Sequence, residues 1–125
     1  MAAIMIAERN RAIIDALSQC VESCNLCSYR CNAGHDSMAE CRRLCIDCAE
    51  ICALVHALLS RESKWAAPIA AAAAQVSAEC AAECQKFDDE YCRQCAQACR
   101  ASAERCQELA RREVISPRRA CQAGP

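Results

Sequence analysis

Fifteen cysteines occur in the 125 residues of this chain, and fourteen of them follow a regular spacing. The pattern C-x3-C-x2-C-x3-C occurs twice, at 20–31 and at 41–52. Steps of four, three and four residues keep side chains on one face of a helix that turns about 100° per residue. In a strand the same steps would place the thiols on both faces. The spacing therefore predicts helices that each carry a stripe of thiols. The fourteen are Cys20, Cys24, Cys27, Cys31, Cys41, Cys45, Cys48, Cys52, Cys80, Cys84, Cys92, Cys95, Cys99 and Cys106.

Packing, disulfide bonding and metal binding are the three roles open to such stripes. Packing alone would be better served by Leu, Ile and Val, which bury more apolar area. Two thiols four residues apart on one helix point the same way, which is a poor geometry for a disulfide, and the cysteine count is odd. Metal binding by soft thiolates remains, with Cu(I), Zn(II) and iron–sulfur clusters as candidates.

The net charge of the metal–thiolate complex distinguishes these candidates, because burying uncompensated thiolates is costly. Zn(II) with four thiolates keeps a net charge of about −2 and needs separate groups of four, and iron–sulfur clusters need irregular loop spacing. Cu(I) is monovalent and accepts two thiolates, so one ion per bridging thiolate would neutralise a stripe. We therefore predict many Cu(I) ions per chain, held by thiols four residues apart. These pairs are Cys20/Cys24, Cys27/Cys31, Cys41/Cys45, Cys48/Cys52, Cys80/Cys84 and Cys95/Cys99.

The remaining composition indicates a core of small side chains. Val, Ile, Leu and Phe together make 20 residues, whereas Ala supplies 27 and Cys 15. Two Gly and three Pro argue against an all-β protein. A formal net charge of −1 means that the chain lacks the excess positive charge typical of nucleic-acid-binding proteins. No apolar run approaches the roughly 18 residues of a membrane span. The first residues do not resemble a secretion signal, so we expect a cytoplasmic protein with reduced thiols.

Local signals place four helices. Gly34 ends the first, and Ser37 with Glu40 is a capping box for the second. Pro68 suits the first turn of the third, and Asp88 or Asp89 caps the fourth. The expected helices cover about 8–32, 37–59, 68–86 and 88–114.

Short links between these helices predict an all-α protein, an antiparallel up-down-up-down four-helix bundle with a Cys-lined core. The bundle is expected over residues 1–115, followed by a loose C-terminal tail at 116–125 that contains a free Cys121. The thiols should line one end, and Trp65 should pack at the other end or at a subunit contact. The apolar residues expected to close that other end are Ile13, Leu17, Val55, Ile69, Val76 and Leu109.

Three cysteine-rich segments, CVESCNLC at 20–27, CIDCAEIC at 45–52 and CRQCAQAC at 92–99, resemble the four-helix-bundle copper storage proteins of bacteria, in their cytosolic branch. The likeness covers about residues 12–110. It implies a homotetramer of bundles, each filled with many Cu(I) ions on the fourteen cysteines, with access at an end marked by His or Met. Ser77 and Ser102 occupy inward positions where richer members carry Cys, which implies a lower capacity.

Three further side chains are candidate copper ligands. His35 and Met38 fall at the end of the bundle that the thiols line, beside the turn between the first two helices. Both can ligate Cu(I) there; alternatively, His35 is an exposed loop residue and Met38 packs against the core. His56 lies one turn past Cys52, where it can be a deep ligand or a hydrogen-bonded core His.

The sequence thus predicts cytosolic storage and detoxification of multiple Cu(I) ions, without catalysis. Copper ions and further copies of the chain are the expected partners, with no nucleic acid and no membrane. The alternatives are a copper chaperone that exchanges one or a few ions, and a thiol-redox or zinc-binding protein.

Overall fold

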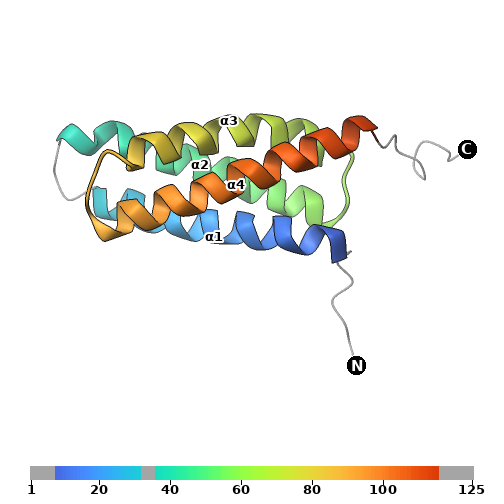
Figure 1. Cartoon of the computed structure of the whole chain (residues 1–125), viewed down its shortest axis with the longest axis horizontal. Helices are drawn as coiled ribbons and strands as arrows, with labels where there is room; N and C mark the ends of the chain where they lie inside the picture. The colour runs from blue at the N-terminus through green and yellow to red at the C-terminus, as the bar shows by residue number, and fades with distance from the viewer. Residues whose placement is uncertain (1–7, 32–35, 116–125) are drawn as a thin grey trace, which may run out of the picture.

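Helices make up the regular secondary structure of the part of the chain that the computed structural model describes, residues 8–31 and 36–115. The elements are α1 (Glu8–Cys31), the short 3-10 helix η1 (Asp36–Met38), α2 (Ala39–Ser60), α3 (Ala66–Cys84) and α4 (Glu90–Ile115). The four long helices lie side by side, with α1 against α2 and α4, and α3 against α2 and α4 (Figure 1). This confirms the predicted all-α four-helix bundle. The tail at 116–125, with Cys121, lies outside the described residues.

The break between α3 and α4 falls where the sequence predicts it. Helix α3 ends at Cys84 and α4 begins at Glu90. The backbone carbonyl of Asp89 accepts hydrogen bonds from the N–H groups of Cys92 and Arg93, each at 3.0 Å. Asp89 therefore occupies the position just before the helix, where a carbonyl accepts the first helical hydrogen bond.

The predicted capping box at the start of α2 is wrong. Met38, and not Ser37, holds the N-cap position, and it makes no side-chain cap hydrogen bond. Glu40 Oε1 instead accepts hydrogen bonds from Nε and Nη2 of Arg43, at 3.2 and 2.9 Å. The chain turns into α2 through η1, so Ser37 lies one residue too early to cap the helix.

Helix α2 ends in a Schellman motif built around Glu62. The N–H of Glu62 donates to the carbonyl of Leu59 at 3.0 Å, and that of Ser63 donates to Leu58 at 2.9 Å. Glu62 has a φ of 53°, a left-handed conformation that glycine usually adopts. The tight reversal leads into α3, whose first turn contains Pro68 as predicted.

Apolar side chains fill the end of the bundle opposite the α3–α4 turn. Ile13, Leu17 and Val55 are fully buried there, and Leu109 is 3% exposed. Ile69 and Val76, which were expected to help close this end, are only half-buried and pack against the core from its edge. At this end the fully buried positions of α3 are alanines, Ala70 and Ala73. The inward stripe of α3 is therefore rotated from the one that its cysteines alone suggested.

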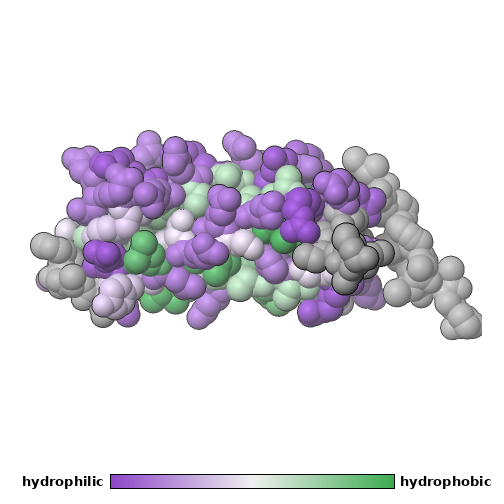
Figure 2. All heavy atoms as spheres, turned by 90° about the horizontal axis from the view of Figure 1, so that it is seen from below, coloured by the Kyte–Doolittle hydropathy of each residue, from purple (hydrophilic) through white to green (hydrophobic). Residues whose placement is uncertain are grey.

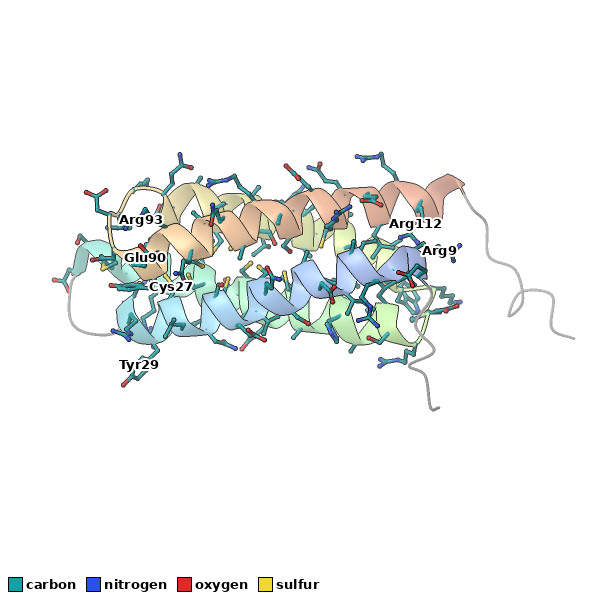
Figure 3. All side chains as sticks on the ribbon, turned by 60° about the horizontal axis from the view of Figure 1, so that its bottom comes forward. Arg9, Cys27, Tyr29, Glu90, Arg93 and Arg112 are labelled. Carbon is teal, nitrogen blue, oxygen red and sulfur yellow. The ribbon has the colours of Figure 1, made fainter. Side chains whose placement is uncertain are left out.

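A polar contact joins the outer ends of α1 and α4. Arg112 Nη1 donates to Oδ1 of Asn10 at 3.0 Å, and Asn10 is 2% exposed. Figure 3 places Arg112 beside the first turn of α1, where Arg9 is labelled. This end of the bundle is closed by an apolar layer with a hydrogen bond outside it.

None of the helices in the described ranges has the length and apolar character needed to cross a bilayer.

Leu17→Ala should lower the free energy of unfolding of the metal-free protein by about 2–5 kcal/mol, because it leaves a cavity in the apolar end. The measurement is denaturant unfolding under reducing conditions. Leu26→Ala is the matched control, since Leu26 is on the same helix and 44% exposed. Equal losses in both variants would contradict a core that depends on this end.

Candidate metal centre

The fourteen cysteines of the helices all point into the bundle. Thirteen have no exposed surface, and Cys31 is 4% exposed. In Figure 3 the sulfur atoms gather between the helices, with Cys27 directed inward and Tyr29 directed away. The thiols form a column along the bundle axis, which we call the thiol column. All fourteen are free thiols.

The column contains four groups of four sulfur atoms, and within each group the atoms lie within 4.8 Å of one another. From the α3–α4 turn inward, the groups are Cys27/Cys31/Cys41/Cys92, Cys27/Cys41/Cys45/Cys84, Cys24/Cys45/Cys80/Cys95 and Cys20/Cys24/Cys48/Cys99. Neighbouring groups share members, so the sulfur atoms form a continuous series. Cys24, Cys27, Cys41 and Cys45 each belong to two groups. Such shared thiols are placed to bridge two metal ions.

The shortest sulfur–sulfur distances join different helices. Cys20 and Cys48 are 3.5 Å apart, as are Cys24 and Cys99. Predicted pairs along one helix are longer, for example 3.9 Å for Cys20 and Cys24. Cys80 and Cys84, a predicted pair, fall into different groups. The spacing of cysteines along the chain thus identifies the inward face of each helix, but each four-sulfur group combines cysteines from different helices.

Sulfur atoms at these distances can hold a metal ion without large rearrangement. A tetrahedral ion with metal–sulfur bonds of about 2.3 Å holds its ligands about 3.8 Å apart. Distances of 3.6 Å between Cys95 and Cys24, and 3.7 Å between Cys45 and Cys95, lie close to that value. A disulfide would instead need about 2.05 Å.

The environment of the column keeps the free thiols neutral. Burial raises the pKa of Cys31 and Cys106 to about 11, and that of Cys92 to about 12. The buried polar side chains of the described residues are Asn10, Ser77 and Ser102, none of them cationic. Thiolates in this core therefore depend on a bound cation for compensation.

Met38 and Tyr91 cover the end of the column nearest the α3–α4 turn. Met38 is 4% exposed, and its sulfur accepts a hydrogen bond from the Tyr91 hydroxyl at 4.0 Å. The same hydroxyl lies 3.4 Å from Asp89 Oδ2. Met38 is thus buried at the end where the sequence placed it. His35 lies outside the described residues.

Tyr91 was missed by the sequence reasoning. Its signal is its position one residue before Cys92, in the first turn of α4. Burial raises its pKa to about 12, so the hydroxyl is protonated at neutral pH and can donate.

His56 does not extend the thiol column. It is half-buried and lines a groove between α1 and α2 with Ser18, Val21, Glu22 and Ala53. Val55 is fully buried and takes the inward position instead. The prediction that His56 continues the stripe of α2 is therefore wrong.

Two serines stand at the inner end of the column. Ser77 and Ser102 have no exposed surface, and their oxygens are 3.3 Å apart. Beyond them lie Cys106 and the apolar end. Both serines are inward, as the sequence predicted.

The comparisons with known proteins agree with this geometry. The sequence model of the copper storage protein (Csp) family matches residues 6–111. A cysteine-rich protein of Bacillus subtilis, YhjQ, is 34% identical over 103 residues, which cover 81% of this chain and 95% of that protein.

Solved structures of copper storage proteins share the fold. The Cu(I)-bound copper storage protein BsCsp3 is 33% identical with a TM-score of 0.78, and the match covers 82% of this chain and 99% of that one. The copper storage protein Ccsp from Streptomyces lividans, loaded with 10 copper equivalents, is 30% identical with a TM-score of 0.76, over 88% of this chain and 91% of that one. The matched sequence model and the shared bundle establish that this chain belongs to the copper storage protein family.

Proposed function

We propose that this protein stores multiple Cu(I) ions on the thiolates of its core, without catalysing a reaction. The observation that carries the proposal is the set of four overlapping four-sulfur groups, buried and spanning the helices. Groups that share sulfur atoms favour several ions bound side by side, each sharing ligands with the next. A chaperone, by contrast, would need one separate site that presents a single ion to a partner.

Charge favours Cu(I) over a divalent ion in this core. Each Zn(II) on four thiolates would leave about two negative charges in a core whose buried residues, among those described, include no cationic side chain. Cu(I) ions on bridging thiolates approach neutrality, because each thiolate is shared. The Cu(I)-bound relative and the relative loaded with 10 copper equivalents support the same ion for this chain.

The ligands in this proposal are drawn from the thiol column, with Met38 and His35 as ligands where copper enters. The protein acts in the cytosol, where thiols are kept reduced between loading events. It assembles as a homotetramer, as the resemblance to the family implies, and association would cover apolar side chains that are exposed on its surface. Trp65 is 58% exposed and Leu54 is 45% exposed, and Figure 2 shows hydrophobic residues scattered among the hydrophilic ones on one face.

Anaerobic titration of the reduced protein with Cu(I), against a competing chelator, should reach saturation at many ions per chain. Measurement of copper and protein in the separated complex gives the ratio. Saturation at one or two ions per chain would contradict storage and favour the chaperone alternative.

Cys45→Ser should lower this ratio, because Cys45 belongs to two sulfur groups and a hydroxyl is a poor ligand for Cu(I). Ala101→Ser, an exposed position on α4, is the matched control and should leave the ratio unchanged. A Cys45→Ser protein that folds and keeps the full ratio would argue against ligation by the column.

Copper loading should raise the melting temperature of the protein, since metal bound only by the folded state stabilises it by mass action. Differential scanning calorimetry of metal-free and loaded samples provides the test. A melting temperature that does not change on loading would place the ions outside the core.

The metal-free protein should lose stability as the pH rises above about 8.5, the ordinary pKa of a thiol. The folded state raises the pKa of Cys31 and Cys106 to about 11, and of Cys92 to about 12. The folded state therefore holds these protons more tightly than the unfolded state. The resulting stability is fully present below the unfolded pKa and disappears as the pH passes the folded values.

Melting temperatures measured from pH 7 to 11 under anaerobic, reducing conditions test this expectation. The copper-loaded protein should show a smaller decline, because its ligand thiols have already lost their protons. A flat profile for the metal-free protein would refute the assignment of neutral, buried thiols.

A further inference from the structure

The two buried serines interrupt the thiol column between its sulfur groups and Cys106. Ser77 on α3 and Ser102 on α4 face each other across the core, with their oxygens 3.3 Å apart. Neither has exposed surface. They fill the level of the bundle at which two helices would otherwise contribute thiols.

Cys52 faces the serines from the sulfur side. Its sulfur lies 3.4 Å from the hydroxyl oxygens of both Ser77 and Ser102. It also lies 3.9 Å from the sulfur of Cys20 and 4.0 Å from that of Cys48. Cys52 therefore retains sulfur neighbours on one side and meets only hydroxyls on the other.

Cys106 lies on the opposite side of the serines. Among the described residues, the hydrogen-bond partner of its sulfur is the Ser102 hydroxyl, at 3.9 Å. Cys106 and Cys52 both lie outside the four-sulfur groups of the described residues, but Cys52 has two sulfur neighbours within hydrogen-bonding distance there, whereas Cys106 has none. The apolar end begins beyond it, with Leu109 one turn further along α4.

Ligand chemistry makes this arrangement a boundary for copper. Cu(I) is a soft ion that prefers thiolate ligands, whereas a neutral serine hydroxyl is a hard and weak metal ligand. An ion placed between Cys52 and Cys106 would meet two hydroxyls at the level where bridging thiolates are needed. The hydroxyls are better suited to donate hydrogen bonds to the Cys52 thiolate, which is the last in the series.

We infer that Ser77 and Ser102 end the copper-filled segment of the thiol column, so that Cys52 is its last ligand and Cys106 binds no copper. The inference rests on the storage function proposed above. It corrects the expectation that all fourteen core cysteines are ligands. It also assigns the two serines a positive role, as hydrogen-bond donors that terminate the series.

The first test is a crystal of the full-length protein saturated with Cu(I), with anomalous scattering recorded at the copper edge. Copper peaks should lie beside the sulfur atoms of the four groups and of Cys52, and none should lie within bonding distance of Cys106. A peak bonded to the Cys106 sulfur would overturn the inference.

The second test compares copper-to-protein ratios in paired variants. Cys106→Ser should retain the ratio of the unaltered protein, whereas Cys99→Ser, two turns earlier on the same helix, should lower it. A fall in the ratio for Cys106→Ser would overturn the inference.

The third test removes the boundary. Ser77→Cys with Ser102→Cys should raise the ratio by at least one ion per chain and place copper at Cys106. Ser77→Ala with Ser102→Ala is the control, since it removes the hydroxyls without adding sulfur, and it should bring no gain. If the double cysteine variant folds and gains no copper, the serines do not set the limit. If it fails to fold, the copper-edge map and the Cys106→Ser ratio still decide the question.

These results separate the boundary from the storage function. An unaltered protein that saturates at one or two ions refutes storage, yet the map still shows whether those ions touch Cys106. Saturation at many ions with copper on Cys106 refutes the boundary and leaves storage standing.

Discussion

Electroneutrality in a closed core is the constraint on which this structure depends. The sulfur atoms sit where water does not reach, and the described core offers no cationic side chain to balance a thiolate. The metal-free column is therefore a set of neutral thiols, which pack as small apolar groups. Ionisation and metal binding must occur together, so each arriving cation replaces protons that burial would otherwise retain.

Because the thiolates must share cations to stay neutral, sulfur atoms from different helices must lie close together, and this requires helices with small inward side chains. Thiols from different helices approach to 3.5 Å, as Cys41 and Cys84 do. Larger inward side chains would separate the helices and leave sulfur atoms out of reach of a shared ion. Ala70 and Ala73 keep α3 close to its neighbours beyond the sulfur groups. The ordinary hydrophobic packing is concentrated at one end, around Leu17.

Sequence periodicity predicted the helices and their inward faces, because cysteines at steps of three and four can share only one side of a helix. It could not decide between Val55 and His56, which lie about 50° to either side of the thiol stripe of α2 on a wheel of 100° per residue. Contact with the neighbouring helices selects Val55. The composition of the sulfur groups also could not be predicted from the sequence, since it depends on how the helices are aligned along the bundle. Glu40 looked like half of a cap, but a nearby arginine holds its carboxylate.

The apolar end around Leu17 and Val55 closes the thiol column on one side. We therefore expect metal ions to enter and leave at the other side, past Met38, and to fill and empty the column in order. The first ions to arrive can pass from thiolate to thiolate toward the interior, and later ions occupy the sites near Cys31. On withdrawal the most recent arrivals are expected to leave first, while the innermost ions exchange slowly. The consequence is a fast reserve and a slow reserve of the same metal, although the thiol ligands are of one chemical type.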